Sequence, residues 1–307
     1  MGVFVFLPFV LPLTALPIAR LAEQHLHPRA ATRLLSAVGA VLGLCSTLCL
    51  GLLAIVGTAQ LPGNPLPDGW ADPEVRAAVP HDEVVGKSAV GALLAATAAC
   101  WALVARRRRV RRRALRALRG LPGGAVAVLP DETPYAHALP GGRGRIVVST
   151  GMLAGLDSRE RRVLFAHERA HLTGRHHRYL LLTGLAARAN PFLRPLSSTV
   201  AYTVERWADE EAARVVGDRR VAARAVGKAA LMSRPAPTLA SFAAPGPVPR
   251  RVAALLGPAP VAHTWPPTFT TAGLAAWAAA AGALLSAMSS ANSAVTMFLI
   301  LKAATPL

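Results

Sequence analysis

The chain has 307 residues, of which 53% are apolar and only 16% are charged. This balance is too apolar for an ordinary soluble domain of that length, and the apolar excess falls in blocks that predict transmembrane helices. The net charge of +18 is unevenly distributed along the chain. The three cysteines lie in apolar stretches without CxxC spacing, so the sequence gives no reason to expect a cysteine metal site.

Four apolar stretches are long enough to cross about 30 Å of hydrocarbon as helices. They cover residues 2–19, 34–57, 88–105 and roughly 269–301. After the first stretch comes the first positive charge, Arg20, whereas a secretory signal carries its positive charge before the apolar run. We therefore expect a retained membrane anchor whose N-terminus faces outward.

The charges of the connecting loops orient these helices. Arg20, Arg29 and Arg33 lie between the first two stretches, and an arginine run at 106–113 directly follows the third. By contrast, the loop at 58–87 is rich in acidic residues and proline. Because cytoplasmic loops carry an excess of Lys and Arg, the sequence predicts that the basic segments are cytoplasmic and the acidic loop is external.

The arginine run at 106–113 is also compatible with nucleic-acid binding. No aromatic residues accompany it, however, and it directly adjoins a predicted transmembrane helix. Contact with anionic lipid head groups is therefore the favoured interpretation, and we expect no direct contact with nucleic acid.

These features predict a mainly α, multi-span membrane protein with about four transmembrane helices and a cytoplasmic, mostly helical domain carrying a small β-sheet. Its predicted parts are an N-terminal membrane domain with three transmembrane helices, a cytoplasmic domain and a C-terminal transmembrane helix, at 1–105, 106–268 and 269–307. Within the cytoplasmic domain we expect two strands, four helices and a Pro/Ala-rich linker, at 126–129, 145–149, 158–174, 176–188, 196–216, 218–233 and 234–268.

Residues His167 to His171 form an HExxH motif. On a helix, positions i and i+4 share one face, so the imidazoles of His167 and His171 can converge on one metal ion. Neutral imidazole suits Zn²⁺, and Glu168 beside the first histidine can act as a general base without being a ligand. The motif therefore predicts a zinc-dependent peptidase site.

A catalytic zinc ion usually has three protein ligands, and two residues compete for the third position. Glu205 opens an ExxxD pattern in which Asp209, one turn later, can accept a hydrogen bond from a ligand histidine. Alternatively, His177 completes HExxHxxGxxH, the metzincin pattern. The continuing helical pattern after Arg175, without a methionine turn near a pocket, favours Glu205.

Five stretches of the chain together resemble the BlaR/MecR-type membrane metallopeptidases, which are related to the HtpX/Ste24-type peptidases. The resemblance covers roughly residues 125–255 and is carried by 145–153, 163–171, 190–192, 205–209 and 250–256. It implies one Zn²⁺ per chain held by His167, His171 and Glu205, with Glu168 as the base. It also implies that Asp209 orients a ligand histidine.

The well-known sensors of this type carry an external penicillin-binding domain after the last transmembrane helix. Here the sequence stops at Leu307, so we expect no β-lactam sensing by such a domain. The acidic loop at 58–87 is then the sizeable external segment that remains as a receiver of signals.

The sequence thus predicts a zinc metalloendopeptidase of the HExxH plus ExxxD, gluzincin-like type. It is expected to be multi-pass in the cell membrane, with the catalytic domain in the cytoplasm. Its substrate would be a protein or peptide, and the resemblance suggests a cytoplasmic transcriptional repressor in signal transduction. The alternatives are an HtpX/Ste24-like quality-control peptidase and a non-catalytic receptor or scaffold with a structural zinc. Glu168 counts against the scaffold, because a structural site needs no base.

Other residues are open to two interpretations. The strand segment Ile146 to Val148 is either an edge strand that pairs with a substrate peptide or an ordinary core strand. Tyr202, Arg206 and Arg214 share the expected helix of Glu205 and are either structural or oxyanion-stabilising. We expect His176 to face solvent.

Overall fold

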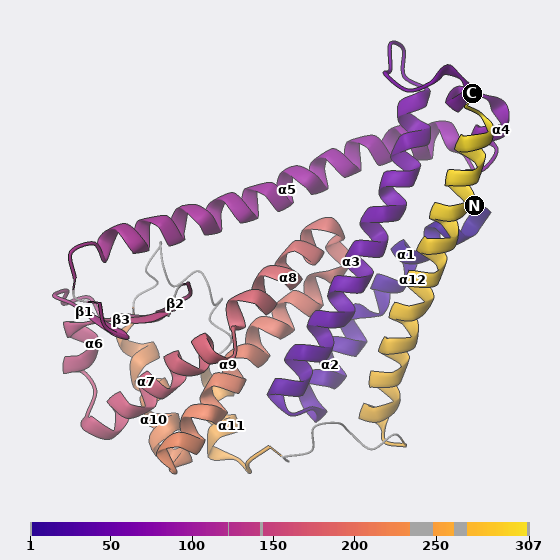
Figure 1. The fold of residues 1–307 in the computed structure, drawn as a ribbon. Helices are drawn as coiled ribbons and strands as arrows, with labels where there is room; N and C mark the ends of the chain where they lie inside the picture. The colour runs from indigo at the N-terminus through magenta and orange to yellow at the C-terminus, as the bar shows by residue number, and fades with distance from the viewer. Residues whose placement is uncertain (1, 122, 142–143, 234–247, 261–268, 306–307) are drawn as a thin grey trace.

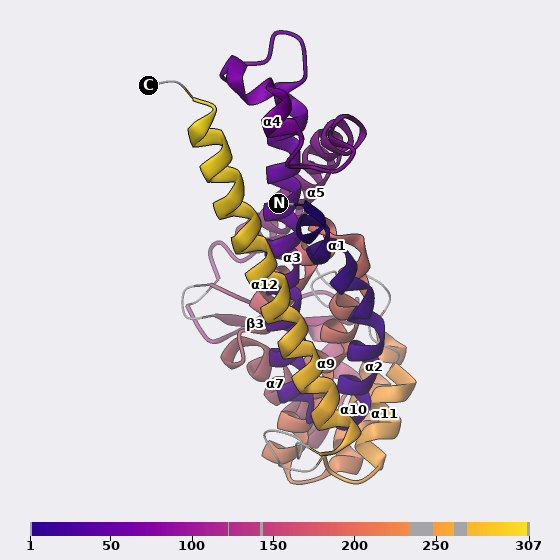
Figure 2. The same ribbon diagram turned by 90° about the vertical axis from the view of Figure 1, so that its right-hand side faces the viewer.

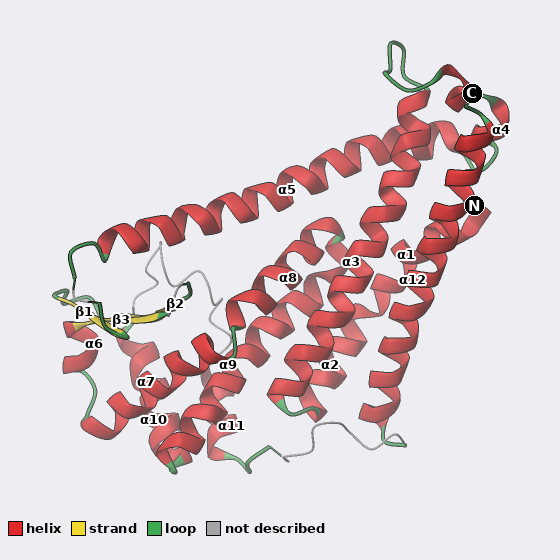
Figure 3. Ribbon diagram, in the orientation of Figure 1, coloured by secondary structure: helices red, strands yellow, loops and turns green. Residues whose placement is uncertain are grey.

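The fold is given by a computed structural model that describes residues 2–121, 123–141, 144–233, 248–260 and 269–305. It is mostly helical, with one small sheet of three strands among the described residues (Figure 3). This confirms the expected mainly α fold with a small β-sheet. Four helices are long and apolar enough to cross a membrane, as predicted, among the residues described.

The first of these apolar segments, Phe4–His25, is irregular because of its prolines. It consists of η1 (Gly2–Phe6), α1 (Leu7–Val10), η2 (Leu11–Thr14) and α2 (Ala15–His25). Proline lacks a backbone N–H and its ring clashes with the preceding turn, which favours the short 3₁₀ segments that precede Pro8 and contain Pro12. The other three long apolar helices are regular: α3 (Pro28–Ala59), α5 (Asp82–Ala117) and α12 (Thr271–Ala303).

Helix α5 is twice as long as the apolar stretch that predicted it, because it begins earlier, at Asp82, and continues through the arginine run to Ala117. It crosses α3 closely at Gly57 and Gly86, where a Cβ on either glycine would collide with the backbone of the other helix. From this crossing, α5 extends away from α3 to the sheet (Figure 1). The acidic connection between the two helices contains η3 (Asp68–Ala71) and α4 (Pro73–Arg76).

The sheet has one strand more than predicted. Its strands are β1 (Val126–Leu129), β2 (Ala136–Leu139) and β3 (Arg145–Ser149), in the order β1-β3-β2. β1 pairs with β3 in parallel, and β2 pairs with β3 antiparallel. The edge-strand interpretation of Ile146 to Val148 is therefore wrong, since β3 is central and these three residues are buried.

The predicted helices of the polar region are all present, with ends shifted by at most two residues. The region contains α6 (Thr150–Ala154), α7 (Ser158–Thr173), α8 (His176–Ala189), η4 (Pro191–Leu193), α9 (Arg194–Val216), α10 (Arg219–Met232) and α11 (Val248–Leu256). A capping box starts α7, in which the Asp157 carboxylate accepts from the Glu160 backbone N–H and Glu160 accepts from that of Asp157. The predicted linker is wrong at α11, while its parts 234–247 and 261–268 lie outside the described residues.

Helix α9 joins the polar region to the apolar helices. Its Leu196, Val200 and Val204 are buried in one core with Leu35 and Leu42 of α3. Along its length α9 packs against α2, α3, α7 and α8, and α12 packs against α3 and α2 (Figure 2). The helix that carries Glu205 and Asp209 is thus fixed on one side by α7 and on the other by the apolar helices.

Candidate metal centre and active site

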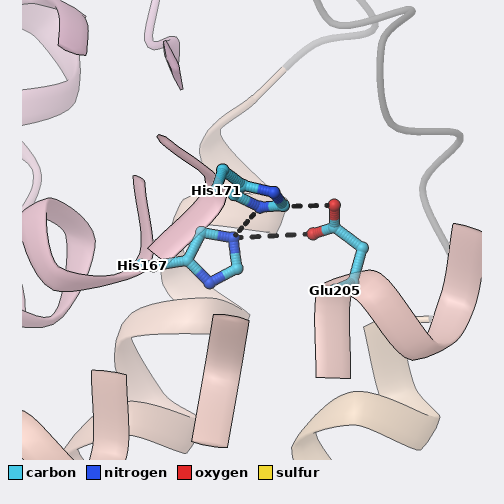
Figure 4. Close-up of side chains that lie close together, drawn as sticks. All are labelled: His167, His171 and Glu205. Atoms are coloured by element: carbon cyan, nitrogen blue, oxygen red, sulfur yellow. Dashed lines mark hydrogen bonds and ion pairs between the residues drawn. The ribbon is translucent and has the colours of Figure 1, made fainter. Parts of the chain in front are cut away.

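Two neighbouring helices bring the sequence-predicted site residues together. α7 supplies His167, Glu168 and His171, and α9 supplies Glu205 and Asp209. His167 and His171 are four residues apart on α7, as are Glu205 and Asp209 on α9, so the two members of each pair share one helix face. Figure 4 shows the two imidazoles and the Glu205 carboxylate pointing toward one another.

The donor atoms of these three residues are spaced as zinc requires. The two Nε2 atoms of His167 and His171 lie 3.1 Å apart, and each lies 3.5 Å from an oxygen of Glu205. Around a tetrahedral zinc ion with bonds of about 2.0–2.1 Å, neighbouring ligand atoms are about 3.3 Å apart. The buried Oε1 of Glu205 has no hydrogen-bond partner among the described residues, so it is free to bind a cation. The residues therefore fit a zinc ion.

His167 is held from behind by charged groups. Its Nδ1 lies 3.1 Å from Oδ1 of Asp209, which is fully buried. Asp209 in turn accepts two hydrogen bonds from Arg251 of α11, from Nε at 2.8 Å and from Nη2 at 2.7 Å. A third nitrogen of Arg251, Nη1, lies 3.1 Å from Oε2 of Glu205. One guanidinium thus contacts two buried carboxylates of the site and offsets part of their negative charge.

His171 is held from behind by a neutral ring. Its Nδ1 lies 3.0 Å from Nδ1 of His176, and the two rings meet edge to face with centroids 4.8 Å apart. His176 is buried at 1% exposure, so the expectation that it faces solvent is wrong. Trp207 of α9 covers the other side of His176, with ring centroids 4.5 Å apart.

The electrostatics of the site favour a bound cation. Burial alone would lower the pKa of His167, but the carboxylates of Asp209 and Glu205 outweigh it and raise that pKa to about 10. The same negative potential that holds a proton on His167 attracts a divalent metal ion. Burial likewise opposes ionisation of Glu205, yet the neighbouring histidine and Arg251 charges hold its pKa well below the usual range.

Glu168 differs from the other carboxylates in that nearby positive charges do not outweigh the effect of its burial. It is 8% exposed, and burial raises its pKa to about 7, where a carboxylate can both take up and release a proton near neutral pH. The backbone N–H of Ala138 in β2 hydrogen-bonds to it, which places the edge strand β2 beside the base.

A cavity of about 200 Å³ opens in front of this group. Its polar lining residues include His167, Glu168, Glu205 and Arg251. Small and apolar side chains of β2, α7 and α10 also line it, among them Ala136, Leu164, Val226 and Ala229. Such a lining, with a few polar groups among apolar ones, suits an apolar side chain next to a polar reacting bond.

The rival residues lie elsewhere. Among the described residues, the group able to hold a metal contains His167, His171 and Glu205 and not His177. The three oxyanion candidates from the sequence do not line the cavity. Tyr202 lies under the guanidinium of Arg250, Arg206 pairs with Glu210, and Arg214 is exposed beside Glu211.

Two residues of this site were not predicted from the sequence. Arg251 lies in α11, within the stretch expected to be a linker. The sequence feature that marks it is the arginine pair at 250–251. His176 lies in the run of histidines that follows HExxH, where its spacing suited neither the third ligand position nor a known motif. Both contact metal-facing side chains only because separate turns of the chain fold back on α7 and α9.

Comparison with known proteins agrees with this geometry. Residues 104–193 match the sequence profile described as Peptidase family M48. The match includes His167, Glu168 and His171, and ends before Glu205. No curated protein and no solved structure is similar enough to the chain to count as a match. Residues 104–193 therefore carry the domain of peptidase family M48, a family of zinc metallopeptidases.

Proposed function

We propose that this protein is a membrane-anchored zinc endopeptidase with one catalytic zinc held by His167, His171 and Glu205. The observation that carries the proposal is the placement of Glu168. It is buried beside the three donors and lines a mostly apolar cavity. A structural zinc site has no use for a base there, so this arrangement favours an enzyme over a scaffold.

Each residue has a defined part in the proposed reaction. Zinc, when bound, acts as a Lewis acid and makes water nucleophilic near neutral pH. Glu168 accepts the proton of the attacking water and delivers it to the leaving amine, for which its raised pKa is suited. Asp209 and Arg251 hold His167 and Glu205 in place and set the charge balance of the site.

The substrate we propose is an extended protein segment with an apolar side chain near the cleaved bond. β2 is the edge strand that lies beside Glu168, and an extended peptide can add to such an edge through backbone hydrogen bonds. Ala136 of the same strand lines the apolar cavity. Backbone pairing with β2 and binding of a side chain in the cavity would therefore involve adjacent parts of one peptide.

We further propose that the protein is multi-pass in the cell membrane and that the catalytic side is cytoplasmic. The N-terminus, the acidic loop after α3 and the C-terminal end of α12 lie at one end of the molecule (Figure 1). The turn between α2 and α3, the beginning of α12 and α9 to α11 lie toward the other end. The termini and connections of the long helices thus alternate between the two ends of the molecule. This alternation and the arginines near the catalytic end support the orientation predicted by the positive-inside rule.

The resemblance to BlaR/MecR-type proteins supports a cytoplasmic transcriptional repressor as the substrate, cleaved in response to a signal. The match to Peptidase family M48 is equally compatible with cleavage of damaged membrane proteins. The two roles differ in what is cut. A folded repressor cleaved at one bond favours signalling, whereas cleavage of many unfolded membrane segments favours quality control.

The proposed function is tested with the full-length protein in detergent and quenched fluorescent peptides that carry varied apolar residues. We expect cleavage by the zinc-loaded wild type and a loss of at least about 100-fold in Glu168→Gln, the range lost with a general base. The variant should still bind zinc, because Glu168 is not a ligand. Glu211→Gln, which removes a carboxylate outside the site on α9, is the matched control. Equal cleavage by wild type and Glu168→Gln would contradict the proposal.

A further inference from the structure

His176 is a buried histidine for which the proposed reaction has no use. We propose that it is a positioning residue for the metal site: its Nδ1 accepts the Nδ1–H of His171 and thereby aims Nε2 of His171 at the zinc. This inference rests on the proposed zinc site. It assigns to a neutral imidazole the task that a carboxylate performs behind His167.

The tautomers of the two rings follow from the contacts. A histidine that binds metal through Nε2 must carry its proton on Nδ1, and that proton needs an acceptor. Nδ1 of His176 lies 3.0 Å from Nδ1 of His171, within hydrogen-bond distance. It can accept only if His176 is neutral with its proton on Nε2, which its 1% exposure favours because a second positive charge would be buried there.

The arrangement is not explained by stability alone. With the proton on Nε2, His176 carries a buried donor, and Nε2 has no hydrogen-bond partner among the described residues. A buried unpaired donor carries a free-energy cost to the fold. An apolar side chain of similar size would avoid that cost, so the imidazole is better explained by its contact with His171.

The fold around His176 holds the ring in one orientation. Arg175 has a left-handed backbone conformation, with φ of 52°, which turns the chain so that α8 starts back against α7. Gly174 leaves room for the ring, because a Cβ there would collide with Nε2 of His176. His171 and Trp207 then contact the ring, at centroid distances of 4.8 and 4.5 Å. These contacts fix the ring independently of any metal.

The test measures zinc affinity of the full-length protein by competition with a chelator. We expect His176→Ala to bind zinc about 10–100-fold more weakly than wild type, as is typical when the partner of a ligand histidine is removed. His176→Asn should stay within about threefold of wild type, because the amide oxygen can take the position of Nδ1. His177→Ala, one residue further on the same helix, is the matched control and should not change the affinity.

A second readout separates positioning from packing. In the Co²⁺-loaded protein, the visible absorption of the metal should shift in His176→Ala and return in His176→Asn, since it reports on ligand orientation. Equal weakening in Ala and Asn would mean that His176 only fills space, and unchanged affinity in both would also overturn the inference. A wild-type protein that binds no zinc would instead overturn the proposed function.

Discussion

The two histidines of the proposed zinc site stand in opposite surroundings, although they lie one turn apart on α7. Behind His167 is a charged network, in which Asp209 of α9 is paired with Arg251 of α11. Behind His171 is a neutral aromatic group, in which His176 lies between the ligand ring and Trp207. In both cases the atom toward the metal is Nε2, and Nδ1 faces the supporting group.

The difference shows that the support of a ligand histidine can come from a residue close to it in the sequence or from residues far apart in the sequence. His176 is five residues from His171 and is positioned by the turn that joins α7 and α8. Arg251 is 42 residues from Asp209 and depends on the docking of α11. Changes in α11 should therefore disturb the His167 side of the site first, while changes at the α7–α8 turn should disturb the His171 side.

The largest effect on stability is expected on the charged side of the site, for the substitution Arg251→Leu. This change leaves the buried carboxylates of Asp209 and Glu205 without their common positive partner, which typically costs about 3–5 kcal/mol. Zinc supplies positive charge at the same place, so the loss should be larger in the zinc-free protein than in the zinc-loaded one. Thermal unfolding with and without zinc measures both.

Arg250→Leu is the matched control for that experiment, because Arg250 precedes Arg251 in α11 and points to Tyr202 and Glu23. It should destabilise the protein much less. An equal loss of stability in Arg251→Leu with and without zinc would mean that Arg251 does not balance the charge of the metal ligands.

A smaller effect is expected on the neutral side, with Trp207→Leu. The change removes the ring over His176 and also the aromatic face under Arg29 and Arg33, whose guanidinium carbons lie 5.4 and 5.8 Å from its centroid. Aromatic and cation–π contacts of this kind contribute about 1–2 kcal/mol together. We expect a loss of that size in thermal unfolding and zinc binding weakened by less than in His176→Ala. Weaker binding than in His176→Ala would show that Trp207 supports more than this ring.

The smallest effect concerns a charged contact far from the metal, at the start of α7. Burial opposes ionisation of Glu160, but hydrogen bonds from Lys228, Asp157 and Arg224 lower its pKa to about 2. A lowered pKa adds stability above the unfolded value of about 4.5, and that stability is lost as the pH falls from there toward 2.

Between pH 6 and pH 3 the loss from Glu160 should be about 1 kcal/mol, because its half-exposed partners are screened by water. Glu160→Gln should remove this part of the acid sensitivity in thermal unfolding of the zinc-free protein. The same acid sensitivity in wild type and variant would show that the ion pairs of Glu160 add no stability.

Local spacing explains what could be predicted from the sequence. HExxH and ExxxD are patterns of one helical turn, so the sequence alone identifies five residues of the site: His167, Glu168, His171, Glu205 and Asp209. The long apolar stretches likewise predicted the four long helices, because composition alone determines that signal. The extent of α5 was underestimated because its arginines end the apolar run, although arginine is a good helix former.

Contacts between distant segments explain what was missed. Arg251 reaches Asp209 through the packing of α11 on α9, which no local pattern reveals. The burial of His176 depends on the left-handed residue Arg175, a conformation that is rare for arginine. The strand β2 contains no β-branched residue, unlike β1, and its pairing places β3 in the centre of the sheet. The periodicity of the sequence does not predict the order of the strands in a sheet.

The most direct measurement is the zinc content of the purified protein by elemental analysis, for wild type, Glu205→Gln and His177→Ala. With His167, His171 and Glu205 as ligands, wild type and His177→Ala should each contain close to one zinc per chain, and Glu205→Gln should lose most of it. Loss of zinc in His177→Ala alone would contradict this ligand set and favour the HExxHxxGxxH set. Absence of zinc from the wild type would contradict the proposed peptidase altogether.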